Sequence, residues 1–108
     1  MSFWTMLMLK AHDGNGDAVA QAHINRRCVE EAQETISGFL HGETMLSAED
    51  PSLVCVMCTW EDEAAYKEWQ NSPVRAKQTE DLMKLISVDV KTYSYRSIHT
   101  VAKPRKKQ

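Results

Sequence analysis

Four stretches of the chain have the apolar pattern of β-strands. Residues 3–11 and 53–60 are apolar at almost every position, which predicts strands that are covered on both faces. Residues 39–47 read as a further strand, and in residues 87–101 small apolar side chains alternate with charged and aromatic ones. The turn formers at 48–52 are few enough to join the second and third strands as a hairpin.

Two helical stretches separate these strands. Residues 17–37 contain no glycine or proline, carry apolar residues near one face, and are followed by Gly38, where a C-terminal glycine belongs. Asp17 is a plausible N-cap for this helix. The second stretch begins with acidic residues at 61–63, is interrupted and restarted at Ser72-Pro73, and continues to residue 86.

The predicted order is β-α-β-β-α-β, which is the order of a ferredoxin-like α+β sandwich. In that fold one four-stranded antiparallel sheet carries both helices on a single face. Residues 3–11 carry apolar side chains on both sides, with Trp4, Met6 and Met8 on one and Phe3, Leu7 and Leu9 on the other, so the face away from the helices also needs a cover. We expect a second copy of the chain to supply it, as a homodimer whose sheets form a dimeric α/β barrel.

The length of 108 residues suits one domain, which we place at residues 1–101, followed by a basic and disordered tail at 102–108. The tail holds four of the thirteen Lys and Arg residues, so the body is acidic and lacks the basic surface that nucleic-acid binding requires. No apolar run reaches the ~18–20 residues of a membrane-spanning helix. Three cysteines, an odd number, argue against a disulfide framework and favour a cytoplasmic location.

Two segments, Gly38–Thr44 and Cys58–Pro73, resemble the antibiotic-biosynthesis-monooxygenase family. The shared pattern is a helix ending in Gly-Phe, a hairpin, a strand ending in Trp60, an acidic helix start, Tyr66 six residues on, then Trp69 and a Ser-Pro break. The resemblance covers roughly residues 3 to 96 and implies the ferredoxin-like fold. It implies less about activity, because the family includes quinone-forming oxygenases, haem-degrading oxygenases and members of other roles.

The haem-degrading members have an Asn on the first strand, a Trp in the second helix and a His nine or ten residues after it. Trp69 matches, but the two positions for the His hold Gln78 and Thr79, and the first strand has no Asn. This comparison argues against haem degradation by that mechanism.

The quinone-forming members need neither metal nor flavin. They share a set of four residues: an Asn, a Trp four residues later, a Tyr six residues after that, and an Arg. Trp60 and Tyr66 fit this spacing, whereas Val56 occupies the Asn position and Arg75 is a loose candidate for the Arg.

The histidines and cysteines show no metal pattern. No two histidines are four residues apart, and Cys55 and Cys58, three apart on a strand, point to opposite faces. His23 is placed where it could line the space between the first helix and the sheet and act as a base, although a plain structural role is favoured for it and for His41. The candidate catalytic residues are His23 and Tyr66, and the candidate substrate-binding residues are Trp60, Trp69, His41 and Arg75.

The resulting hypothesis is a cofactor-independent monooxygenase that acts on a small aromatic molecule such as a hydroquinone or phenol. Such a site needs a base and a dry apolar cavity more than a metal. The alternatives are a non-catalytic small-molecule or haem-binding module of the same fold, and a structural domain whose interior is filled, since Trp60, Tyr66 and Trp69 suit a core as well as a binding wall.

Overall fold

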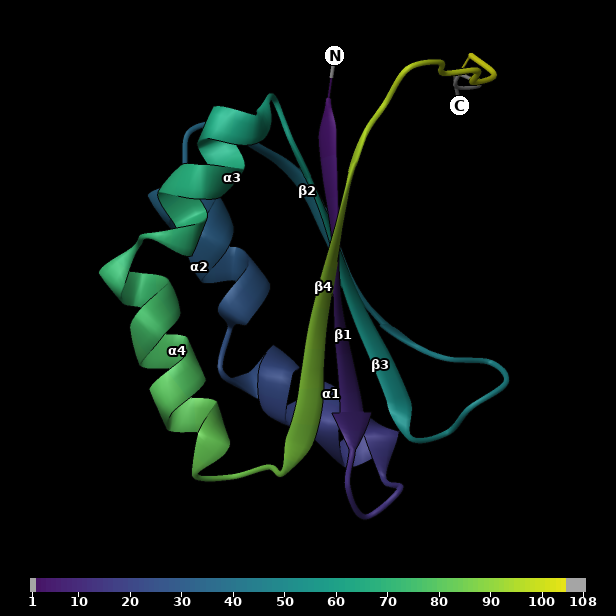
Figure 1. The fold of residues 1–108 in the computed structure, drawn as a ribbon, viewed down its shortest axis with the longest axis vertical. Coiled ribbons are helices and arrows are strands. Elements are labelled where there is room, and N and C mark those ends of the chain that lie inside the picture. Colours follow the sequence, from purple (N-terminus) through teal and green to yellow (C-terminus); the bar gives the residue numbers. More distant parts are fainter. Residues whose placement is uncertain (1, 105–108) are drawn as a thin grey trace.

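A computed structural model of the chain describes residues 2–104. Its elements, in chain order, are β1 (Phe3–Ala11), α1 (Gly16–Asn25), α2 (Cys28–Thr35), β2 (Phe39–Leu46), β3 (Leu53–Trp60), α3 (Glu63–Gln70), α4 (Pro73–Met83) and β4 (Val88–Arg96). The four strands form one antiparallel sheet in the order β2-β3-β1-β4, and the helices lie on one face of it (Figure 1). The predicted ferredoxin-like α+β fold is confirmed.

The single helix predicted for residues 17–37 is in fact two. Arg27 adopts a left-handed conformation with φ of 59°, which ends α1 and begins α2. α1 also starts one residue earlier than Asp17, because the side chain of Asn15 accepts a hydrogen bond from the backbone N–H of Ala18 at 3.1 Å and acts as the N-cap.

The break predicted at Ser72-Pro73 is confirmed. The Ser72 hydroxyl accepts a hydrogen bond from the backbone N–H of Val74 at 3.1 Å, and Pro73 opens α4. α4 ends at Met83, before the predicted residue 86. β4 ends at Arg96 rather than residue 101, because its only neighbouring strand, β1, begins at Phe3, the partner of Arg96. Of the predicted tail, residues 102–104 have no regular structure and 105–108 lie outside the described residues.

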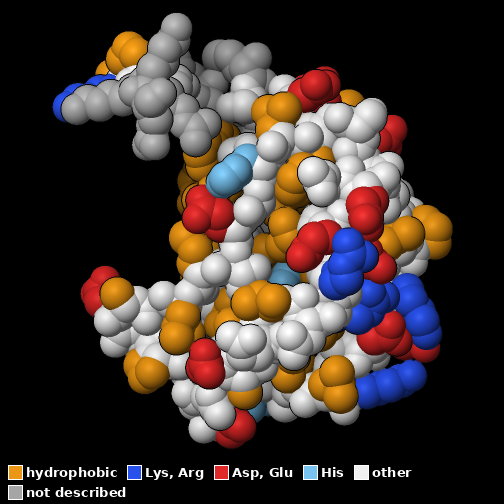
Figure 2. Space-filling model, turned by 180° about the vertical axis from the view of Figure 1, so that it is seen from behind, with side chains coloured by type: hydrophobic (Ala, Val, Ile, Leu, Met, Phe, Trp, Pro, Cys, Tyr) orange, Lys and Arg blue, Asp and Glu red, His pale blue; other side chains and the backbone are white. Residues whose placement is uncertain are grey.

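The two faces of the sheet differ. The core lies between the sheet and the helices and includes Val54 and Trp60, which are almost fully buried. On the other face, the strand registers bring Trp4, Met6 and Met57 together, with no element of the described chain over them. Hydrophobic side chains line this hollowed side in Figure 2, whereas charged side chains gather over the helices. No described helix has the length and apolar character needed to cross a membrane.

Candidate functional site

A pocket of about 310 Å³ lies between the helical layer and the sheet. Its floor is the helix-facing side of β1, β3 and β4, and its other walls come from α1, α2, α3 and α4. The lining is mainly apolar and contains no carboxylate. The pocket opens beside β4, where Val90 and Met83 line it and are 60% and 74% exposed.

Every predicted site residue except His41 lines this pocket: His23, Trp60, Tyr66, Trp69 and Arg75. His41 is on β2, its side chain is exposed, and its ring nitrogen lies 2.9 Å from the carboxylate of Glu43. In the antiparallel register it is paired with Thr59, which neighbours Trp60 and therefore points to the opposite face. The structure thus separates His41 from the other candidates.

Aromatic side chains form one end of the pocket. The Trp60 ring packs edge-on against Phe39, with centroids 5.4 Å apart, and its Nε1 donates a hydrogen bond to the Thr5 hydroxyl at 3.1 Å. Tyr66 lies 5.7 Å from Trp60 and 5.8 Å from Phe3, and its hydroxyl makes no hydrogen bond to another described residue. These contacts hold the Tyr66 ring while its hydroxyl stays free for a ligand.

His23 belongs to the last turn of α1 and is only 5% exposed. Its Nδ1 is buried and has no hydrogen-bond partner among the described residues. Burial lowers the pKa of His23 to about 4, against a smaller opposing effect of the Glu30 carboxylate. The imidazole is therefore neutral near pH 7, and its buried Nδ1 has an unused hydrogen-bonding capacity.

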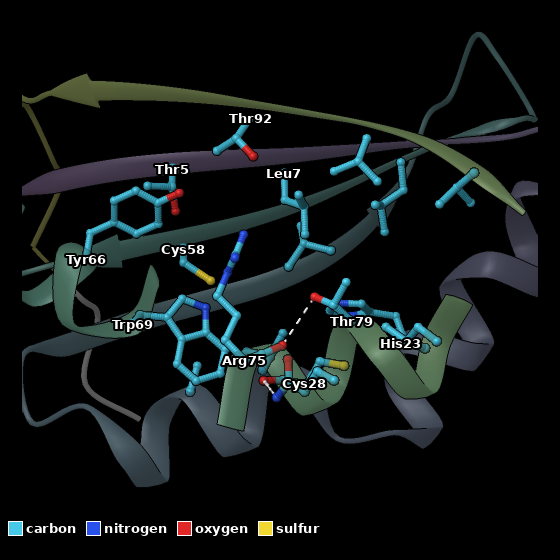
Figure 3. A pocket seen from close by; sticks show the side chains of 18 of the residues that line it. Thr5, Leu7, His23, Cys28, Cys58, Tyr66, Trp69, Arg75, Thr79 and Thr92 are labelled. Carbon is cyan, nitrogen blue, oxygen red and sulfur yellow. Dashed lines mark hydrogen bonds between the residues drawn. The ribbon is translucent and has the colours of Figure 1, made fainter. Parts of the chain in front are cut away.

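Arg75 lies in the first turn of α4. Its side chain extends from the helix toward the sheet and ends in the space near Cys58 and Leu7 (Figure 3). None of the ion pairs formed within residues 2–104 includes Arg75. The pocket therefore contains a cationic group with no carboxylate beside it.

The comparisons with known proteins agree with this geometry. Residues 3–78 match the sequence model of the family described as antibiotic biosynthesis monooxygenase. The chain belongs to that family. No curated protein sequence matches the chain.

Among solved structures, the fold is similar to SnoaB, a cofactor-independent oxygenase from Streptomyces nogalater, at 9% identity and a TM-score of 0.72, over 94% of this chain and 98% of that one. It is also similar to Rv0793 from Mycobacterium tuberculosis, at 11% identity and a TM-score of 0.71, over 94% and 100% of the chains. Protein SO0527 from Shewanella oneidensis matches at 18% identity and a TM-score of 0.66, over 87% and 90%. At these identities the likeness concerns the fold.

Gln78, one of the two residues at the histidine positions of the haem-degrading family members, has a structural role here. It is 6% exposed, and its amide donates to the Cys28 carbonyl oxygen at 3.1 Å and to the Glu31 carboxylate at 2.9 Å. It thereby ties α4 to α2 across one wall of the pocket. Thr79 donates to the carbonyl oxygen of Arg75 at 3.2 Å, within its own helix.

The pocket also includes polar residues that the sequence reasoning did not select, notably Thr5, Thr92 and Cys28. The alternation along β1 and β4 could have identified the two threonines, because each shares its face with helix-facing apolar residues. Burial raises the pKa of Cys28 and of Cys58 to about 12, so both thiols stay protonated. Within residues 2–104, no three His, Cys, Asp or Glu side chains cluster closely enough to hold a metal ion.

Proposed function

We propose that this protein is a cofactor-independent monooxygenase for a small aromatic substrate of the hydroquinone or phenol class. The observation that supports the proposal most is the apolar pocket lined by both His23, whose Nδ1 is buried without a partner, and Tyr66, whose hydroxyl makes no hydrogen bond to another described residue. Membership of the antibiotic biosynthesis monooxygenase family supports the reaction class. A volume of about 310 Å³ is at the small end of ligand pockets, which suits a compact aromatic molecule.

The chemistry requires the substrate to become an anion before oxygen reacts with it. A ring CH₂ or CH group beside a phenolic oxygen loses its proton, and the resulting carbanion gives electrons to O₂. For a CH₂ group that becomes a carbonyl, one oxygen atom is retained and the other leaves as water, so the substrate supplies all the electrons. In this proposal His23 accepts the proton, the Tyr66 hydroxyl donates to the developing oxyanion, and Trp60 and Trp69 hold the ring.

A second candidate function is ligand binding without chemistry. The low basicity of His23 favours it, because a base with a pKa of about 4 is poorly matched to a phenol. With a phenolic pKa of about 10, transfer of the proton to His23 would be unfavourable by roughly 8 kcal/mol without further stabilisation of the anion. The same pocket would then serve as a binding module for small aromatic molecules.

An oxygen-electrode assay on chelator-treated protein tests the enzymatic proposal against a panel of hydroquinones and polyphenols. We expect oxygen uptake above the buffer rate, reduced by Tyr66→Phe and by His23→Ala, with the loss of one oxyanion donor costing on the order of a hundredfold. His99→Ala is the matched control, because His99 is exposed and does not line the pocket. Binding of these molecules without any uptake would replace the oxygenase by the binding module.

The working unit in this proposal is a homodimer in the cytoplasm. Trp4, Met6 and Tyr93 on the open face of the sheet give a second copy an apolar surface to cover, and the three free thiols suit a reducing compartment. Sedimentation at micromolar concentration should show twice the chain mass, and Met6→Lys should shift the protein toward the monomer. A well-folded wild-type monomer at that concentration would refute the dimer.

A further inference from the structure

The open face of the sheet, opposite the helices, is rich in sulfur. Four of the six methionines and one of the three cysteines lie on it: Met6, Met8, Met45, Cys55 and Met57. On their other side, β1 and β3 present aliphatic side chains to the helices, namely Leu7, Leu9, Val54 and Val56. An apolar contact surface does not require this change of residue type, because aliphatic side chains provide such a surface equally well.

Cys55 lies at the centre of these sulfur atoms. In the strand registers Met8 of β1 and Met45 of β2 are directly opposite Cys55, one on each side. Met57 follows two residues later on the same face, and Met6 is its partner on β1. Directly paired side chains have Cβ atoms about 4.5–5.5 Å apart, and methionine has three rotatable bonds. The four thioethers are therefore within reach of one ion bound at Cys55.

The contact between Cys55 and Met6 has the dimensions of a metal site. The Cys55 thiol donates a hydrogen bond to Met6 Sδ, and the two sulfur atoms are 3.7 Å apart. In a tetrahedral site, metal–sulfur bonds of about 2.3 Å place two sulfur ligands about 3.8 Å apart. An ion that replaces the thiol proton would therefore bond both atoms with little movement of either side chain.

The type of ligand limits the type of ion. Thiolate and thioether groups are soft ligands that select Cu(I), whereas Mg²⁺ and Ca²⁺ take oxygen ligands. Zn²⁺ takes Cys, His and carboxylate ligands, and residues 2–104 contain no cluster of three such side chains. A Cu(I) ion held by one thiolate and neutral thioethers has no net charge, which limits the cost of placing it on an apolar surface.

We propose that Cys55 and the methionines around it bind one Cu(I) ion. Cys55 supplies a thiolate, whose proton is released as the copper–sulfur bond forms, and Met6 supplies a thioether. Met8, Met45 and Met57 are the candidates for the remaining ligand positions. The site is complete within one chain and is separate from the pocket, since the two lie on opposite faces of the sheet. In the proposed homodimer the second copy covers this face and shields the ion from water.

Anaerobic titration of the reduced full-length protein against the coloured bicinchoninate complex of Cu(I) tests this proposal. The protein should withdraw one equivalent of Cu(I) per chain, and the colour of the complex should fall accordingly. Zn²⁺, offered in the same way from a chromophoric zinc indicator, should stay with the indicator. Retention of all the Cu(I) by bicinchoninate, or withdrawal of Zn²⁺ as readily as Cu(I), would overturn the proposal.

Substitutions assign the ion to these residues. Cys55→Ser should weaken Cu(I) binding by more than about a hundredfold and Met6→Leu by about tenfold or more, because even changes beside metal ligands cost about 10–100-fold in affinity. Met83→Leu is the matched control: this methionine is on α4, on the helical side of the sheet, and is 74% exposed. It should retain the wild-type affinity. Wild-type affinity in Cys55→Ser would refute the site.

A measurement on the wild-type protein identifies the ligands even if Cys55→Ser does not fold. Ag(I) is a redox-inert substitute for Cu(I), and NMR spectra of the methionine methyl groups report which thioethers it contacts. The Met6 resonance should shift, together with at least one of those of Met8, Met45 and Met57, whereas that of Met83 should not. Unchanged resonances, or equal shifts of all of them, would contradict the proposal. Neither result bears on the oxygenase, which the oxygen-electrode assay tests separately.

Discussion

Burial of His23 should make the stability of this protein depend on pH in a range above the one in which its carboxylates act. The histidine has a pKa of about 4 in the folded chain and of about 6.5 in the unfolded chain, so the unfolded state binds a proton first. The contribution of His23 to the unfolding free energy is therefore fully present above pH 6.5 and is lost as the pH falls toward 4. The difference corresponds to about 3 kcal/mol in all, of which about 2 kcal/mol should be gone by pH 5.

Acidic groups act in a different range. Hydrogen bonds from Ser52 and the charge of Lys10 lower the pKa of Asp50 to about 2, and hydrogen bonds with basic and amide groups also lower the pKa of Glu31 and Asp81. The stability that these carboxylates contribute is present above their unfolded pKa values of about 4 and is lost only at lower pH. The interval from pH 6.5 to 5 therefore separates the effect of His23 from that of these carboxylates.

Urea unfolding at fixed protein concentration, repeated between pH 7.5 and 5, measures the effect. His23→Leu removes both the titration and the unpaired Nδ1, so its unfolding free energy should be nearly flat across this interval and should exceed that of the wild type at pH 5. His99→Gln, a substitution at an exposed site, should leave the wild-type slope unchanged. If His23→Leu loses stability with pH as steeply as the wild type, His23 is not the group responsible.

Two further substitutions test how the pocket and its surroundings are held. Gln78→Leu should lower the unfolding free energy by about 2–3 kcal/mol in thermal or urea denaturation, because it leaves the Cys28 carbonyl and the Glu31 carboxylate without their amide donor. Thr79→Ala, a substitution at an exposed neighbour, is the control and should cost less than about 1 kcal/mol. Gly16→Ala should lower the unfolding free energy by about 1–3 kcal/mol, since its Cβ would collide with the Pro51 carbonyl oxygen and lie 2.9 Å from Leu46 Cδ1. Gly14→Ala is the control: its Cβ would meet no other atom, so the unfolding free energy should fall by a smaller amount, which reflects only the strain of an alanine at a φ of 82°.

The strands and their order could be predicted because they depend on a period of two that the sequence shows directly. Val88, Val90 and Thr92 face the pocket as their alternation with charged residues indicates. The break between α1 and α2 could not be predicted in this way. It depends on the left-handed backbone at Arg27, a residue type with no preference for that conformation. Glycine or asparagine there would have signalled it.

The candidate site was predictable to a similar extent. Trp60, Tyr66 and Trp69 have spacings along the chain that the family shares, and they meet because a strand end and the following helix lie close together. His23 and Arg75 are more than fifty residues apart, and only the folded structure shows that both line one pocket. His41 was selected by residue type alone, and the alternation of β2 turns it to the other face of the sheet.

The pocket opens at the edge strand β4, and this position also gives a reason for the pocket to be filled. β4 is an edge strand, and the helices leave Val90, on its inner face, 60% exposed. An exposed apolar surface next to a free strand edge favours aggregation unless something covers it. A ligand in the pocket would cover these side chains, and because it binds only the folded chain it would raise the unfolding free energy by mass action. Stability and ligand recognition are therefore linked at this edge of the sheet.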